Sequence, residues 1–108
     1  MRPYSIEEIK RRISPIAQKY NLAAVYLFGS YARGEANEES DIDLLVDLSG
    51  SSVRGIVLGV LYHELYEALE TDIDLVTVAS LNQPVMHSSE RLFRETIQKE
   101  RKIIYAAA

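Results

Sequence analysis

The chain has 108 residues, a formal net charge of −4 and no cysteine, and these figures exclude several classes of protein. Its length suits one domain, so we expect residues 1–108 to fold as a single domain. Without cysteine there is no disulfide, thiolate nucleophile or cysteine-based zinc site, which fits a reducing cytoplasm. No apolar run approaches the roughly 20 residues that cross a bilayer. The excess of acid argues against a surface that holds nucleic acid by charge. We therefore expect a cytoplasmic protein with no membrane contact and no direct nucleic-acid binding.

The acidic residues lie mostly in the middle of the chain. Eleven of the sixteen fall between Glu35 and Asp74, whereas residues 1–19 and 90–102 are rich in Lys and Arg. The basic ends are interpreted as helix faces in contact with solvent, and they would also suit an acidic partner. The acidic block needs a different explanation, because several of its members interrupt apolar runs.

A helix is predicted near the N-terminus. Ser5 followed by Glu8 is the pattern of a capping box. Apolar residues then recur at spacings of three and four over residues 6–20, as they do along one face of a helix. Pro15 lies inside this pattern and has no amide hydrogen, so we expect a kink or a break near Ser14.

Strands and helices are predicted to alternate along the rest of the chain, which indicates an α/β or α+β domain. The run 23–28 is continuously apolar, and this is typical of a strand covered on both faces. In the last helix, Leu92, Phe93 and Ile97 are expected to face inward. We expect strands at 23–28, 41–46 and 73–78 with a fourth added by 103–105, a helical turn and loop within 31–40, and helices at 57–69 and 88–99.

Three acidic side chains within apolar runs carry the first functional signal. Asp41 and Asp43 are two residues apart, so they project from the same face of one strand, and Asp74 lies inside the third run. Ionised carboxylates on a covered sheet are costly unless they are paired, hydrogen-bonded or bound to a metal ion. Mg²⁺ suits such oxygen ligands and commonly takes one or two carboxylates together with substrate phosphates. The alternative is a strand face that alternates acidic and apolar side chains and meets solvent.

A glycine-serine pair supplies the second signal. Gly29 and Ser30 end the apolar run 23–28 and precede the predicted helical turn. Free backbone N–H groups at such a turn, with the serine hydroxyl, can hold a phosphate, although Gly-Ser is also an ordinary turn. A phosphate cradle and a carboxylate cluster ten residues later together indicate a site for a metal-bound nucleoside triphosphate.

The cradle and the paired carboxylates together resemble a known signature. Gly29-Ser30, ten further residues and then Asp-Ile-Asp at 41–43 match the G-S-x10-D-x-D pattern of nucleotidyltransferases with a DNA polymerase β-like palm. The longer stretches LFGSYARGEA and SDIDLLV are similar to the minimal nucleotidyltransferases, and the similarity covers residues 6–105. The resemblance implies a small mixed sheet of three to four strands flanked by helices.

The resemblance also implies a role for each residue of the site. Gly29 and Ser30 would hold the triphosphate of ATP, and Asp41 and Asp43 would bind two Mg²⁺ ions. Asp74 lies in a strand similar to the one that supplies the family's third carboxylate. It would bind one of the ions and help to deprotonate the acceptor hydroxyl.

Two neighbouring positions leave alternatives open. Asp72 shares the strand parity of Asp74 and competes with it for the third role, but Asp74 is preferred because it lies within the apolar run. Arg33 follows the cradle and is expected either to reach a phosphate or to pair with Glu35 or Glu38.

The histidines and several tyrosines have no assigned chemistry. His63 and His87 are far in sequence from the signature, so we expect an ordinary surface role for both. Tyr31, Tyr62 and Tyr66 are expected to pack within the fold, with contact to a partner as the alternative.

The acceptor is inferred from the family. Minimal nucleotidyltransferases are often antitoxins whose partner is a HEPN-domain toxin, a small helical RNase, and active members transfer AMP from ATP to a tyrosine of that toxin. A chain of 108 residues leaves no room for a second, acceptor-binding domain, so a partner would complete the site.

Two alternatives to AMP transfer onto a toxin stay open. One is an antitoxin that blocks the toxin by binding alone, and the other is nucleotide transfer to a small hydroxyl compound. No base-reading residue is evident.

Overall fold

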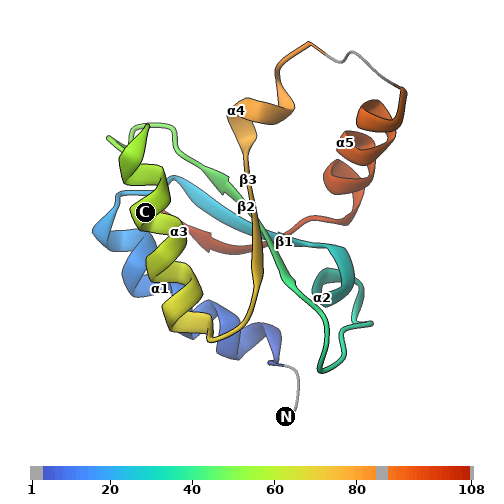
Figure 1. The fold of residues 1–108 in the computed structure, drawn as a ribbon, viewed down its shortest axis with the longest axis horizontal. Coiled ribbons are helices and arrows are strands. Elements are labelled where there is room, and N and C mark those ends of the chain that lie inside the picture. Colours follow the sequence, from blue (N-terminus) through green and yellow to red (C-terminus); the bar gives the residue numbers. More distant parts are fainter. Residues whose placement is uncertain (1–3, 85–87, 108) are drawn as a thin grey trace.

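The computed structural model describes residues 4–84 and 88–107, so His87 lies outside the described residues. In those two ranges no helix is both long and apolar enough to cross a membrane. Helices and strands alternate along the chain as expected from the sequence, except that α4 and α5 follow one another (Figure 1). The elements are α1 (Ile6–Lys19), β1 (Ala24–Phe28), α2 (Gly29–Arg33), β2 (Ile42–Asp47), α3 (Ile56–Leu69), β3 (Ile73–Thr77), α4 (Val78–Leu81), α5 (Ser88–Glu100) and β4 (Lys102–Ala106).

The strands form one mixed sheet with the order β3-β2-β1-β4. β1 is antiparallel to both of its neighbours, β2 and β4, whereas β2 and β3 are parallel. Parallel neighbours need a long crossover connection, and α3 provides it. The prediction of a small mixed sheet, with a fourth strand from the C-terminal apolar run, is therefore confirmed.

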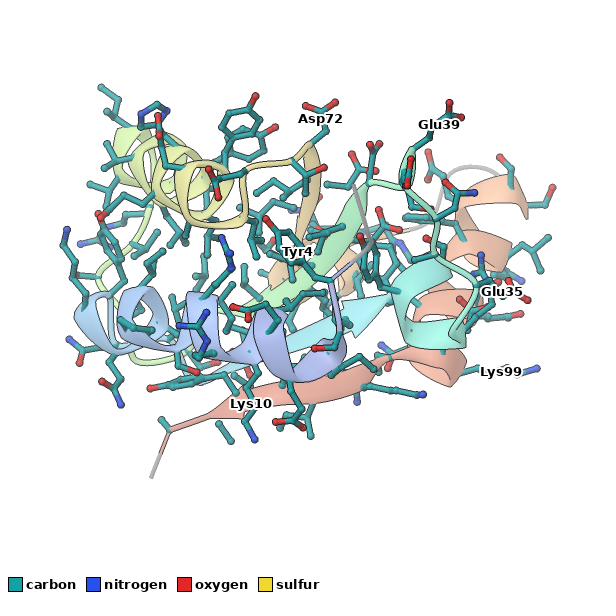
Figure 2. All side chains as sticks on the ribbon, turned by 90° about the horizontal axis from the view of Figure 1, so that it is seen from below. Tyr4, Lys10, Glu35, Glu39, Asp72 and Lys99 are labelled. Atoms are coloured by element: carbon teal, nitrogen blue, oxygen red, sulfur yellow. The ribbon has the colours of Figure 1, made fainter. Side chains whose placement is uncertain are left out.

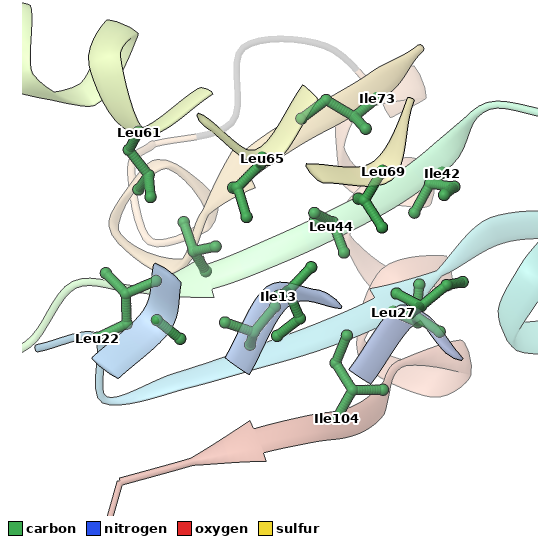
Figure 3. Close-up of a cluster of buried hydrophobic side chains, with 14 of the residues drawn as sticks. Ile13, Leu22, Leu27, Ile42, Leu44, Leu61, Leu65, Leu69, Ile73 and Ile104 are labelled. Atoms are coloured by element: carbon green, nitrogen blue, oxygen red, sulfur yellow. The ribbon is translucent and has the colours of Figure 1, made fainter. Parts of the chain in front are cut away.

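Helices α1 and α3 lie side by side over one face of the sheet (Figure 1). Their buried side chains pack against every second residue of the strands, namely those that point to this face of the sheet. Together these side chains form the main hydrophobic core (Figure 3). The members include Ile9, Ile13 and Ala17 of α1, Leu61, Leu65 and Leu69 of α3, and Val25, Leu27, Ile42, Leu44, Val46 and Ile73 of the strands.

The opposite face of the sheet carries α5 and a smaller buried cluster of Phe28, Leu45 and Ile97. Successive strand residues alternate between the two faces. Asp43 and Asp74 therefore share the α5 face, because their strand neighbours Leu44 and Ile73 belong to the main core. The site lies where the apolar cover of this face ends.

Helix α1 runs through Pro15 without interruption, so the predicted break is wrong. The Ser5 half of the predicted capping box is confirmed, since its side chain accepts a hydrogen bond of 3.1 Å from the amide of Glu8, whereas the Glu8 carboxylate accepts hydrogen bonds from Arg11 and Arg12. Proline inside a helix costs roughly 3 kcal/mol. Ile9 and Ile13 are fully buried on the opposite side of the helix, and burying one such side chain contributes about 1.5–3 kcal/mol. Packing of this face therefore outweighs the lost hydrogen bond.

Some boundaries and orientations differ from expectation. Val78 begins α4 instead of ending β3, and Asp41 lies one residue before β2. Ile97 is buried as predicted, but Leu92 and Phe93 are 65% and 51% exposed, so their predicted inward orientation is wrong. An amphipathic pattern cannot distinguish a side chain that packs in the core from one that lines an open cavity.

Candidate active site

The turn between β1 and α2 is built on Gly29. Its φ of +72° lies in the left-handed region, which glycine adopts readily. A Cβ at this position would lie only 2.0 Å from Oδ2 of Asp43, so the backbone of the turn touches that carboxylate. The first amide groups of α2, including that of Ser30, have no acceptor within the helix. The turn thus presents amide N–H groups beside a carboxylate.

The register of the sheet places two carboxylates next to each other. Asp43 pairs with Phe28 of β1 on one side and with Asp74 of β3 on the other. Asp41 precedes β2 with the same parity as Asp43, and its side chain is exposed. The topology therefore brings together three carboxylates that are up to 33 residues apart in the sequence.

A cavity of about 760 Å³ lies between this end of the sheet and α5. Asp72 does not line it, and Figure 2 shows Asp72 pointing away from the sheet. The cavity contains all six residues that the sequence singled out for the site, together with an apolar wall. Its lining consists of Gly29, Ser30, Arg33, Asp41, Asp43, Asp74 and Glu100 with Phe28, Leu75, Val76, Phe93, Thr96 and Ile97.

The environment of Asp43 is unfavourable to its negative charge. The pKa of this carboxyl is raised to about 7, first by burial, then by a hydrogen bond shared with Asp74 and by the nearby charges of Asp74 and Asp41. The positive charge of Arg33 lowers the pKa of Asp43, but this effect is smaller. Without a cation, Asp43 therefore retains a proton up to neutral pH.

The raised pKa of Asp43 predicts how the free energy of unfolding changes with pH. The pKa of Asp43 rises from 3.8 to about 7 on folding, so between these values the folded protein holds the extra proton. Stability without metal should therefore fall as pH rises through this window and level off above it. Asp43→Asn should flatten the dependence and make the protein about 1–2 kcal/mol more stable at pH 8, after allowance for solvent screening. Urea unfolding in EDTA between pH 4 and 8 measures this, and a wild-type curve that rises through the window would contradict it.

The donor groups fit Mg²⁺ held together with phosphates. In the described part of the chain no three His, Cys, Asp or Glu side chains form a ready-made metal site. Mg²⁺ does not require one, since it commonly binds one or two carboxylates and completes its shell with substrate phosphates and water. Asp43 and Asp74 are close enough to share a proton, and Asp41 adds charge to the same cavity. A divalent cation relieves this repulsion.

Arg33 lines the cavity but is engaged in ion pairs. Its Nε lies 2.7 Å from Glu35, and one terminal nitrogen lies 3.0 Å from Glu100 of α5. The hydrogen bond to Glu35 and then that to Glu100 raise the pKa of this guanidinium. The pairing with Glu35 was one of the alternatives predicted, whereas Glu100 comes from an element 67 residues away.

The remaining candidates do not line this cavity. His63 is exposed on α3 and lies 3.3 Å from Glu67. Tyr31 is buried in the main core. Tyr62 and Tyr66 are both 40% exposed, and the Tyr62 hydroxyl donates a hydrogen bond of 3.3 Å to the carbonyl of Ile73. Packing is therefore confirmed for Tyr31, while the other two tyrosines are half on the surface.

The sequence did not point to the contribution of α5. Phe93, Thr96 and Glu100 complete the cavity opposite the carboxylates. These positions are at least 52 residues from Asp41 in the sequence, and they belong to no local motif. Their only signal is the amphipathic pattern of the helix.

Comparison with known proteins identifies the family. Residues 11–107 match the family model described as polymerase β, nucleotidyltransferase. A protein of Methanocaldococcus jannaschii that is named as a candidate protein adenylyltransferase is 39% identical over 94 residues, which cover 86% of this chain and 96% of that protein. The protein adenylyltransferase MntA of Thermococcus cleftensis is 30% identical over 98 residues, which cover 86% and 94%.

A solved structure supports the fold. A chain in the complex of the tri-AMPylated Shewanella oneidensis HEPN toxin with its MNT antitoxin has a TM-score of 0.61 to this protein. It is 22% identical, and the match covers 94% of this chain and 73% of that one. The family model and the two relatives show that the chain belongs to the polymerase β nucleotidyltransferases, among members that are named protein adenylyltransferases.

Proposed function

We propose that this protein is an antitoxin that transfers AMP from ATP to a tyrosine hydroxyl of a HEPN-domain RNase toxin and thereby neutralises it. The observation that carries the proposal is the single cavity in which the Gly29 turn meets the paired carboxylates Asp43 and Asp74. Two observations support the choice of reaction. Relatives are named protein adenylyltransferases, and a chain with the same fold occurs in a complex with an AMPylated HEPN toxin. We place the reaction in the cytoplasm, where both ATP and the RNA cleaved by such a toxin occur.

One group of residues in the cavity would bind the nucleotide, and another would bind the metal ions. Gly29 and Ser30 would bind the triphosphate through amide N–H groups and the serine hydroxyl. Asp41 and Asp43 would hold two Mg²⁺ ions, with Asp74 sharing one of them. When bound, the ions offset the charge of the phosphates during the transfer.

The transfer itself exchanges one bond at phosphorus for another. The acceptor oxygen bonds to the α-phosphorus, and the bond from this phosphorus to the oxygen that bridges to the β-phosphate breaks, so pyrophosphate leaves. Asp74 would take the proton of the acceptor hydroxyl. The attacking and leaving oxygens lie in line, so the acceptor enters from the side opposite the departing pyrophosphate.

A second cavity offers the acceptor a route to Asp74. It has a volume of about 490 Å³ and lies between α3 and the edge strand β3. It shares Asp74 and Leu75 with the nucleotide cavity, and Gly55, Gly59 and Tyr62 also line it. The same helix exposes the large apolar side chains Ile56, Val57 and Val60 as well as Tyr66. An apolar surface continuous with the catalytic carboxylate suits a segment of the toxin that presents a tyrosine better than a small polar compound.

Filling this second cavity should impair the use of the toxin without affecting ATP. A Cβ at Gly59 would meet no atom within 4 Å, so Gly59→Trp can enter the cavity without a backbone clash. We expect it to raise the KM for the toxin about tenfold or more, because the indole would fill the cavity through which the acceptor reaches Asp74. Gly59→Ala adds one methyl group and is the matched control, which should keep the wild-type KM. Steady-state transfer rates at varied toxin concentration measure the effect, and a wild-type KM for Gly59→Trp would contradict it.

The blocking antitoxin and the enzyme differ in their need for the carboxylates. If binding alone neutralises the toxin, a variant with Asp41→Asn and Asp43→Asn will protect cells that express it. The proposed reaction requires that this variant still forms the complex but loses protection. Growth of cells that express both proteins, with co-purification of the complex, distinguishes the two.

A further inference from the structure

The apolar end of the nucleotide cavity carries an aromatic ring with no role in the protein core. Phe93 of α5 is 51% exposed and lines this cavity. Its ring meets Phe28 edge to face, with centroids 6.2 Å apart and planes at 81°. Phe28 is 6% exposed and belongs to the buried cluster with Ile97. The buried ring thus fixes the position of the exposed one without covering it.

The cavity has different chemistry at its two ends. Gly29, Ser30 and the carboxylates lie at one end, while Phe93, Val76 and Ile97 supply an apolar wall from β3 and α5. Its volume of about 760 Å³ is within the range of small-ligand sites, roughly 300–1,000 Å³. A ligand that matches both ends has a polyphosphate at one end and a flat ring with an apolar face at the other.

Two polar side chains of α5 that line this cavity, Thr96 and Glu100, already have hydrogen-bond partners. The Thr96 hydroxyl donates a hydrogen bond of 2.8 Å to the carbonyl of Leu92 within α5. Glu100 accepts two hydrogen bonds from Arg33. Neither group has its full hydrogen-bonding capacity available to read the edge of a base. Stacking on a ring, in contrast, tolerates any base, because every base has a π face.

We propose that Phe93 is the stacking platform for the nucleobase of the substrate, and that the site holds the base by its face with little discrimination between adenine and guanine. The inference deepens the proposed function, on which it rests, by assigning the subsite for the base. It also explains why an apolar side chain, that of Phe93, is exposed although the pattern of the helix predicts that it is buried. The ring packs against the ligand instead of the core.

The test measures binding, not transfer. ATP, GTP and inorganic tripolyphosphate, each with Mg²⁺, are titrated by calorimetry into the wild type and into Phe93→Ala, Phe93→Leu and Phe93→Trp. Phe93→Leu keeps apolar contact with Phe28 but removes the π face. Leu92→Ala is the matched control, since Leu92 is 65% exposed on the same helix and does not line the cavity.

The proposal predicts a specific pattern. Phe93→Ala and Phe93→Leu weaken ATP and GTP alike by roughly tenfold to a hundredfold, the effect of removing one base-stacking ring. Tripolyphosphate binding stays unchanged, Phe93→Trp retains ATP affinity, and Leu92→Ala behaves as wild type. Unchanged ATP affinity in Phe93→Ala, or an equal loss of tripolyphosphate, would overturn the proposal. Either result, combined with AMP transfer by the wild type, would leave the proposed function intact. Wild-type ATP binding with the predicted pattern but no transfer to the toxin would instead overturn the proposed function alone.

Discussion

Asp43→Asn should lower the rate of AMP transfer about a thousandfold, because it removes a ligand of the ions that stabilise the transition state. Asn matches Asp in shape, and it can keep a hydrogen bond to Asp74 without the repulsion between carboxylates. The folded structure should therefore survive, and the loss will be one of chemistry. The rate of AMP incorporation into the toxin, measured at saturating Mg²⁺ and ATP, gives the size of the effect.

Asp72→Asn is the matched control for this substitution. Asp72 lies two residues from Asp74 on the same strand parity, but it is exposed and lies outside the cavity. We expect this variant to transfer AMP at the wild-type rate. If both variants lose activity equally, or if Asp43→Asn retains it, the assignment of the site to this face of the sheet is wrong.

Gly29→Ala should be the second severe substitution. The new Cβ would lie 2.0 Å from Oδ2 of Asp43, so either the turn or the carboxylate must move. Displacement of a catalytic group by about 1 Å can cost roughly a hundredfold in rate. The left-handed φ adds about 1 kcal/mol of strain in any residue with a Cβ. Transfer rates and thermal unfolding of the same preparations separate the two effects.

Gly34→Ala isolates the contribution of strain. Gly34 has a φ of +75°, close to that of Gly29, but a Cβ there would meet no atom within 4 Å. It should lose a similar amount of stability and keep its transfer activity. An equal loss of activity in both variants would show that backbone strain at the ends of α2, and not a clash with Asp43, causes the loss in Gly29→Ala.

The part of the site predicted from the sequence is the part that local structure determines. The glycine-serine pair directly follows β1, and Asp41 and Asp43 lie at the start of β2. Because β1 and β2 are adjacent antiparallel strands, the short spacing in the chain places the two motifs close together in space. Asp74 was identified because a carboxylate within an apolar strand requires a partner, and the parallel register beside Asp43 supplies it.

The rest of the site depends on packing that no local pattern encodes. The placement of α5 over the second face of the sheet brings Phe93 and Glu100 to the cavity, and the pattern of the helix suggested instead that Phe93 would be buried. Pro15 shows the same limit in the other direction. Its local preference predicted a kink or a break, but contacts of the buried helix face with α3 and the sheet keep the helix continuous.

The most direct test of the central claim is the intact mass of the HEPN toxin after incubation with this protein, ATP and Mg²⁺. The account predicts that the toxin gains the mass of one or more AMP groups, that pyrophosphate is released in equal amount, and that tyrosine carries the modification. Omission of Mg²⁺ should abolish the gain. A toxin whose mass is unchanged, although it binds this protein and loses its RNase activity, would contradict the account and favour neutralisation by binding alone.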